Sequence, residues 1–420
     1  MLWFAMLVAM LGIGMVSPLL PVYVRDTLHG PAVAVALSFS GLALAQLIAA
    51  PFIGRLGDRL GAKPFIVTGF FIYAIGAAGY IFAPTWELVV FFRVLSGFGA
   101  AGIFPMSLAY IGRLAPPGRE GTFMGAFSIS QTIGFGLGPL LGGGVRDAVG
   151  ADAAFTLMAF LLAGTGLATL LLLPARGQPN RGSASDYRAP EEPHLGWQEL
   201  IVRPAVQAAL AVQTVVALGW GATSSFVAVF IVSDEGLGTN SALFVGVLLA
   251  TQSLLSGALQ PIFGPLADRL DRLKLVVVGL CVSAVAQFVF PSVPRVLWHG
   301  ELFGEPAVIA PWLLGVIAVV GIAEAVTFPA QQAIFVSVGR AVGMGSIMGL
   351  NQTGSSIGFL TGSLLGALVV EVWNLDAVFR YAGILALIGA VVFAVLMRRA
   401  REELRETGAY GRVSAAEAAR

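Results

Sequence analysis

Charged residues are scarce in this sequence. Only 11% of its 420 residues are Asp, Glu, Lys or Arg, whereas 57% are apolar and a further 53 residues are glycine. A soluble domain is about 25% charged, and a water-exposed surface made from the present composition would be far too apolar. The mean hydropathy of +0.87 therefore indicates a chain that folds in a lipid bilayer.

Cysteine and histidine are also rare, and their rarity removes several classes of function. The single cysteine, Cys281, excludes an intrachain disulfide. The three histidines fall in expected loops, and no Cys, His or Asp spacing is that of a metal site, so we expect neither metal nor cofactor. The sequence has no Walker-type phosphate loop, which disfavours ATP use, and its glycine-rich stretches lie inside apolar runs rather than after strands, which disfavours a dinucleotide site. An enzyme is disfavoured because the sequence has no titratable constellation beyond Glu324 and Arg93.

Long apolar runs fill most of the chain. A membrane-spanning helix needs about 20 apolar residues, and the sequence divides into about twelve such runs. They are 2–24, 32–54, 64–83, 86–112, 122–145, 152–173, 204–232, 242–265, 274–292, 307–337, 344–370 and 377–397. The first run lacks the basic lead and small-residue cleavage site of a signal peptide, so we expect a retained helix. The prediction is an all-α integral membrane protein with about twelve transmembrane helices.

Lys and Arg are distributed unequally between the two sides of these helices. With the N-terminus placed in the cytoplasm, 19 of the 24 Lys and Arg residues are cytoplasmic, 4 are external, and Arg93 lies within a span. Cytoplasmic loops are enriched in Lys and Arg, so we expect a multi-pass protein of the cell membrane with both termini in the cytoplasm. The expected order is a six-helix bundle over 1–173, a cytoplasmic linker over 174–203, a second bundle over 204–397 and a cytoplasmic tail over 398–420.

The two halves repeat each other. Five residues after the second span recur 210 positions later, as Gly54/Gly264, Leu56/Leu266, Asp58/Asp268, Arg59/Arg269 and Leu60/Leu270. Farther along, Phe104-Pro105 recurs as Phe328-Pro329 with a shift of 224, and the fourteen extra residues fit the long external loop from Pro291 to Pro306. Internal repeats in a membrane chain predict a pseudo-symmetric transporter whose site lies between the halves near the midplane.

The segment from Gly54 to Lys63, GRLGDRLGAK, resembles the signature loop of the major facilitator superfamily and lies between spans two and three as in that family. A carboxylate there can meet the positive end of a helix dipole and nearby Arg groups. The resemblance implies a cytoplasmic gating latch, with Arg113 at the end of span four as partner. The implied gating residues are Gly54, Asp58, Arg59, Gly61, Arg113, Gly264, Asp268 and Arg269. A basic loop that only fixes topology is the alternative.

Glycines recur along span five, and together with a proline they resemble the antiporter motif of the twelve-helix drug:proton exporters in that superfamily. The motif residues are Gly125, Gly134, Gly138, Pro139, Gly142 and Gly143. Glycines at four-residue intervals form a groove for tight helix contact, and a proline bends the helix. Helix packing without any bearing on the direction of transport is the alternative, and in the second half Ser363 replaces the proline.

Two ionisable residues lie within expected spans, and a third lies at the end of one. Glu324 is the only carboxylate near the middle of a span, where hydrocarbon favours its protonated form. It is a candidate proton carrier or counter-charge, with a structural contact as the alternative. Arg93 begins an Arg-x-x-x-Gly sequence similar to a family motif and would serve proton coupling or helix bracing, or else extend to the external surface. Asp26 is a candidate that could instead pair with Arg25.

Amides and aromatic residues fall near the expected midplane and are candidates for lining a substrate cavity. They are Gln46, Gln131, Gln252, Gln352, Trp220, Phe226 and Phe328. A buried amide needs partners, so each faces either a cavity or another helix. Apolar walls with a few amides suit a lipophilic substrate.

These observations favour a secondary active transporter that works by alternating access, with a small-molecule substrate, protons as coupling ion and lipid as surroundings. Proton-coupled export of a small lipophilic compound or drug is the leading hypothesis. Uptake or exchange of a metabolite by the same fold is one alternative, and a non-transporting membrane sensor is another. A net charge of +1 gives no reason to expect a nucleic-acid partner.

Overall fold

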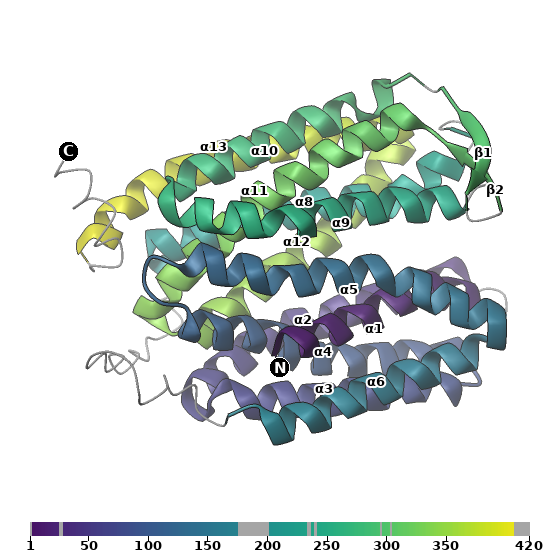
Figure 1. The fold of residues 1–420 in the computed structure, drawn as a ribbon, viewed down its shortest axis with the longest axis horizontal. Coiled ribbons are helices and arrows are strands. Elements are labelled where there is room, and N and C mark those ends of the chain that lie inside the picture. The colour runs from purple at the N-terminus through teal and green to yellow at the C-terminus, as the bar shows by residue number, and fades with distance from the viewer. Residues whose placement is uncertain are drawn as a thin grey trace.

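Two six-helix bundles lie side by side in the computed structural model (Figure 1). The structure describes residues 2–24, 28–174, 201–232, 237–238, 242–294, 296–302 and 305–406. The first bundle contains α1 (Leu2–Val22), α2 (Ala32–Leu60), α3 (Ala62–Ile81), α4 (Trp86–Leu114), α5 (Glu120–Val149) and α6 (Ala151–Leu172). The second contains α8 (Pro204–Val232), α9 (Ala242–Arg269), α10 (Arg272–Val289), α11 (Pro311–Val342), α12 (Met344–Val372) and α13 (Leu375–Glu406). Most of the expected linker and the end of the expected tail lie outside the described residues.

The helices have the length and apolar character that the sequence predicts. Within the described residues, ten are long and apolar enough to cross a membrane, and α1 adds an apolar stretch over Leu2–Val16. The signature segment expected as a loop is mostly helical, because α2 continues to Leu60 and ends only where Gly61 adopts a φ of 85°. Such a backbone conformation favours glycine, so Gly61 sets the turn into α3.

Glycines bring the helices of each bundle into backbone contact. A Cβ atom added to Gly138 of α5 would lie 2.6 Å from the Gly14 Cα of α1, and one added to Gly134 would lie 2.6 Å from the Leu7 carbonyl oxygen. Gly358 and Gly362 of α12 approach the backbone of α8 in the same way. Small residues allow close packing where lipid removes the hydrophobic driving force between helices, so both glycine ladders hold their own bundle together.

A short hairpin stands between α10 and α11. After the 3₁₀ turn η2 (Phe290–Ser292), strands β1 (Trp298–Leu302) and β2 (Glu305–Ile309) pair antiparallel with Trp298 opposite Ile309. The hairpin lies within the segment that changes the register of the repeat, at the right-hand end of the molecule in Figure 1. The sequence predicts a loop there, and the structure has paired strands instead.

The opposite end of the molecule carries most of the described basic side chains. There α2, α4, α9 and α11 end at Leu60, Leu114, Arg269 and Val342, and α13 extends beyond the bundle (Figure 1). We call it the basic end. The basic residues in these helices and at the starts of the helices that follow include Arg55, Arg59, Lys63, Arg113, Arg269, Arg272, Lys274 and Arg340.

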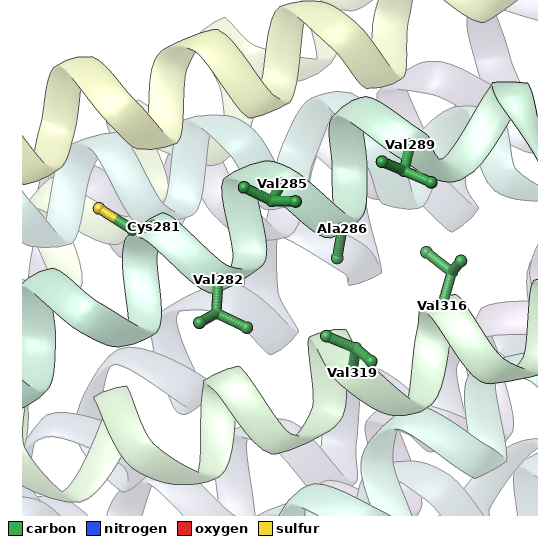
Figure 2. A pocket seen from close by; sticks show the side chains of 7 residues that line it. All are labelled: Cys281, Val282, Val285, Ala286, Val289, Val316 and Val319. Atoms are coloured by element: carbon green, nitrogen blue, oxygen red, sulfur yellow. The ribbon is translucent and has the colours of Figure 1, made fainter.

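A shallow apolar groove runs along the outer surface of the second bundle between α10 and α11. Figure 2 shows that it is lined by Cys281, Val282, Val285, Ala286, Val289, Val316 and Val319. Val285 is 62% exposed and Val289 is 44% exposed. Apolar side chains exposed along a membrane helix suit contact with lipid, so the groove belongs to the outer surface rather than to the interface of the bundles.

Replacing Gly138 with alanine tests the contact of α5 with α1. The added methyl would clash with the Gly14 backbone, and overpacking costs about 1–3 kcal/mol, so we expect a lower unfolding temperature for the purified protein. Gly164→Ala in α6 is the matched control, because nothing lies within 4 Å of the Cβ position at Gly164. Equal unfolding temperatures for the two variants would contradict the packing role.

Candidate functional site

The Asp58 side chain, near the end of α2, binds the first turn of α12 in the opposite bundle. Its carboxylate accepts hydrogen bonds from the backbone N–H groups of Gly345 and Ser346, the latter at 2.7 Å, and from the Ser346 hydroxyl at 2.6 Å. Arg113 of α4 donates to the same carboxylate at 2.8 Å. A helix N-terminus presents free N–H groups and a positive dipole end to an anion, so Asp58 connects the two bundles.

Asp268 makes the pseudo-symmetric contact in the other direction. Its carboxylate accepts from the backbone N–H groups of Gly121 and Thr122 of α5, at 2.6 and 2.8 Å, and from the Thr122 hydroxyl at 2.6 Å. Gly121-Thr122 occupies the place of Gly345-Ser346 in the repeat, 224 residues earlier. Each half therefore caps a helix of the other half, and we call these contacts the two latches.

Glycines allow the helices to meet at the latches. Gly54 of α2 lies directly against Gly345 of α12, and a Cβ atom on Gly264 would lie 2.8 Å from the Gly121 carbonyl oxygen. Gly125 also faces Gly264. The first glycine of the antiporter motif therefore belongs to the interface between the bundles.

Three further glycines and the proline of the antiporter motif pack within the first bundle. Gly134, Gly138 and Gly142 contact α1, and Pro139 lies beside Gly14 of that helix. Gly143 follows Gly142 in the last part of α5.

A buried ion cluster reinforces the second latch, and the sequence analysis did not identify it. Glu120, at the start of α5, accepts from Arg272 Nη2 at 2.6 Å and from Arg340, both of which belong to the second bundle. Arg272 also donates to the Ser337 hydroxyl at 2.7 Å, and Arg340 donates to the Ala115 carbonyl oxygen. Glu120 lacks a matching residue in the repeat, since Met344 stands in its place, so comparison of the halves could not reveal it.

The electrostatics of Glu120 follow from this cluster. Burial alone would raise the pKa of its carboxyl group, but the guanidinium groups of Arg272 and Arg340 outweigh burial and hold the pKa below its ordinary value of 4.5. Glu120 is therefore ionised at neutral pH. Arg59 and Arg269, which the family resemblance also implicates in gating, are exposed at the basic end.

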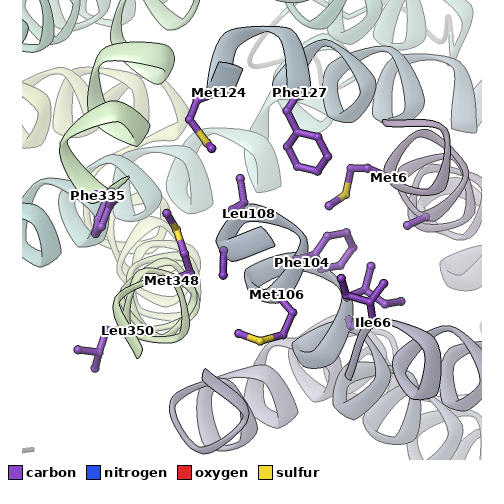
Figure 3. Packing of buried hydrophobic residues seen from close by; sticks show 14 of the residues in the cluster. Met6, Ile66, Phe104, Met106, Leu108, Met124, Phe127, Phe335, Met348 and Leu350 are labelled. Atoms are coloured by element: carbon purple, nitrogen blue, oxygen red, sulfur yellow. The ribbon is translucent and has the colours of Figure 1, made fainter. Parts of the chain in front are cut away.

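An apolar layer lies one turn inward from the latches. Figure 3 shows Met124 of α5 and Leu108 of α4 beside Phe335 of α11 and Met348 of α12. All four side chains are at most 6% exposed. Met124 and Met348 are equivalent in the repeat. The basic end is thus closed by an outer layer of ionic contacts and an inner layer of packed apolar side chains.

Glu324 lies near the middle of α11 and is partly accessible. Its Oε1 accepts a hydrogen bond from Gln252 Nε2 of α9 at 2.8 Å. The residue is partly exposed while its carboxyl group is enclosed by protein, and an acid at this depth in a membrane helix is a candidate for ion binding. The sequence analysis named both residues but did not pair them.

Arg93 is buried within the first bundle rather than extended to its surface. The side chain is close to α2 and α3: Arg93 Nε donates to the Ser38 carbonyl oxygen at 2.9 Å, and the guanidinium lies near the hydroxyl groups of Tyr73 and Tyr80. It is 3% exposed. Arg93 and Glu324 are in different bundles. Asp26 lies outside the described residues.

The expected cavity residues have mixed surroundings. Gln46 of α2 is buried and accepts from Gln352 of α12 at 3.3 Å, a contact across the two bundles. Trp220 of α8 is 42% exposed and lies between Phe135 of α5 and Phe359 of α12, with ring centroids 6.1 and 5.2 Å away.

The other expected cavity residues divide between accessible and packed positions. Gln131 and Phe328 are partly buried. Phe226 packs against Gly366 of α12. Phe226 therefore helps to hold the second bundle together.

Replacing Asp58 with asparagine removes the charge that Arg113 and α12 bind. A hydrogen bond to a charged group contributes about 1.5–3 kcal/mol, so we expect the basic end to open at least about tenfold more often. The labelling rate of a Met348→Cys thiol in purified Cys281→Ser protein measures this opening. Glu371→Gln, at the other end of α12, is the control. An unchanged rate in Asp58→Asn would show that the latch does not hold this end shut.

Acidification should release the Glu120 cluster. Because the pKa of Glu120 is lowered in the closed structure, its stabilisation is complete above the ordinary value of 4.5 and disappears as the pH falls through the lowered pKa. We expect the unfolding temperature of Glu120→Gln to lie below that of the unaltered protein at pH 7, and the gap to narrow at pH values below 4.5. A gap that stays constant over this range would rule out the ion cluster as its cause.

Comparison with known proteins agrees with this architecture. The family model described as Major Facilitator Superfamily matches residues 2–251 and 235–417. The chain is 27% identical to multidrug resistance protein MdtG of Enterobacter lignolyticus, over 92% of this chain and 88% of that protein. It is 24% identical to multidrug resistance protein 2 of Bacillus subtilis, over 91% and 90% of the two chains.

A solved structure shares the fold. The human organic anion transporter MFSD10 superimposes with a TM-score of 0.73 and 16% sequence identity, covering 93% of this chain and 97% of that one. The repeat of two six-helix bundles, the signature segment at Asp58 and the family match over nearly the whole chain lead to one conclusion. The chain belongs to the major facilitator superfamily, and it is a multi-pass membrane transporter rather than an enzyme.

Proposed function

We propose that this protein exports a small lipophilic compound in exchange for protons, with its basic end on the cytoplasmic side of the cell membrane. The observation that carries the proposal is Glu324: a carboxyl group in the middle of α11 that is enclosed by protein and bonded only to an amide among the described residues. Intramembrane acids are rare and commonly serve ion pathways.

Alternating access follows from where the bundles touch. The two latches and the apolar layer join the bundles at the basic end. Because each latch joins a carboxylate of one bundle to a helix of the other, opening this end separates the charged partners without unfolding either bundle. A rocking motion of two rigid bundles about a central site is the expected way for such repeats to work.

Proton coupling requires the Glu324 carboxyl group to alternate between a protonated and an ionised form during the transport cycle. When protonated, the carboxyl group is neutral and tolerates an apolar environment; when ionised, it needs a hydrogen-bond donor or a cation. Substrate entering the central space changes this environment, so proton and substrate compete for the same region. The antiporter motif of α5 and the names of the bacterial relatives support export as the direction.

The substrate class follows from the lining. Trp220 presents a half-exposed indole beside Phe135 and Phe359. Polar contacts between the bundles include uncharged amides, such as the Gln46–Gln352 pair. Aromatic surfaces with a few oriented amides favour a lipophilic compound over a strongly charged metabolite.

Orientation follows from the basic residues. The excess of Lys and Arg at the basic end supports a cytoplasmic location for this end and for both termini. A closed basic end then corresponds to a state that keeps the substrate site from the cytoplasm.

The test is transport in proteoliposomes with a panel of lipophilic compounds and an imposed pH gradient. We expect a proton uncoupler to abolish uphill export, and Glu324→Gln to retain exchange of labelled for unlabelled substrate while losing its dependence on pH. Glu371→Gln, an acid at the far end of α12, serves as control. Export that is indifferent to the uncoupler would favour a uniporter, and pH-dependent export by Glu324→Gln would overturn the role of Glu324.

A further inference from the structure

We propose that Gln252 is a positioning residue that transmits the protonation of Glu324 to the interface between the two bundles. The inference rests on the proposed function, since it gives the proton on Glu324 a mechanical consequence. It depends on the place of Gln252 in α9. One face of this helix contacts Glu324 of α11, and the adjacent face contacts α5 of the first bundle.

The first face of α9 is held tightly against α11. Gln252 Nε2 donates to Glu324 Oε1 at 2.8 Å. Three residues before Glu324 in α11, Gly321 lies so close to Gln252 that an added Cβ atom would stand 2.8 Å from the Gln252 carbonyl oxygen. The bond to the carboxylate is therefore made at a place where the two backbones nearly touch, and the Gln252 side chain has little freedom to find another partner.

The next face of α9 contacts α5 of the first bundle. A Cβ atom on Gly136 would lie 3.4 Å from the Ser253 Cβ, and one on Gly257 would lie 2.6 Å from the Thr132 hydroxyl. Farther along, Gly264 meets Gly121 at the second latch. These α9 positions follow helical spacing, so the stripe that begins next to Gln252 runs to the latch.

Charged groups around Glu324 do not offer an alternative route. On the helices packed against α11, the described charged residues stand at helix ends: Glu120 and Arg146 on α5, Asp268 and Arg269 on α9, Arg272 and Lys274 on α10, Glu371 on α12, and Glu87 and Arg113 on α4. Arg93 is enclosed within the first bundle. The amide of Gln252 is thus the group that senses the charge on Glu324.

Protonation changes the strength of this one bond. A hydrogen bond from an amide to a carboxylate is charge-assisted, and it weakens to a neutral bond once the carboxylate binds a proton. The ionised state therefore holds α9 against α11, and the protonated state loosens it. Because the same helix also forms the α5 interface, a small shift of α9 within the second bundle changes its contact with the first bundle.

The test is the pH profile of export by Gln252→Met, which keeps the side-chain volume and removes the donor. Without the donor, the ionised form of Glu324 loses its stabilising bond and the carboxyl group keeps its proton to higher pH. We expect the profile to move to higher pH by about one unit. Gln331→Met is the matched control, because the Gln331 amide on α11 bonds Gln213 of α8 instead.

The outcomes separate this inference from the proposed function. If Glu324→Gln loses pH dependence but Gln252→Met keeps the original profile, the role of Gln252 is wrong while the proton site stands. A shift of equal size in Gln331→Met would also overturn it. Should Gln252→Met show no exchange at all, the swapped pair Gln252→Glu with Glu324→Gln decides: recovery of pH-dependent export supports the inference, and its absence overturns it.

Discussion

The structure depends on a carboxylate from each half that caps a helix of the other half. Asp58 on α12 and Asp268 on α5 place negative charge where unpaired N–H groups and the helix dipole are most favourable to it. The contact is strong only while the helix start and the carboxylate are aligned, so it sets the relative position of the bundles. The apolar layer one turn inward and the ion cluster of Glu120 also hold the basic end closed. The geometry of this closed end is set by the two carboxylates.

The glycines determine what the carboxylates can reach. If Gly54, Gly121, Gly264 or Gly345 carried a side chain, the helices would stand farther apart and the N–H groups would move out of hydrogen-bond distance. The same residue type also fastens α5 to α1 and α12 to α8. One helix, α5, thus uses its first glycines for contact with the other bundle and its later ones for contact within its own bundle, which a single motif in the sequence does not distinguish.

Much of the fold could be predicted from sequence, because the signals are local or repeated. Apolar run lengths predict the helices, and the recurrence of Asp58 as Asp268 predicts two equivalent bundles. The partners of these residues are another matter: Ser346 and Thr122 carry no motif, and Glu120, Arg272 and Arg340 come together only when the bundles meet. The Gln252–Glu324 pair likewise depends on the packing of α9 on α11, which Gly321 permits. Strand pairing in the hairpin was missed because the sequence analysis treated the interval between Pro291 and Pro306 only as an insertion.

The glycine contacts between the bundles affect the energy barrier to relative motion of the helices. Where side chains interdigitate, one helix can move past another only if the side chains change rotamer and leave the spaces they fill on the facing helix. Each such step adds an energy barrier. At Gly54 against Gly345 and at Gly264 against Gly121 the backbones meet with no side chains between them. If the bundles rock as proposed, these two contacts add no rotamer barrier to the motion, and the remaining resistance comes from the carboxylates and the apolar layer.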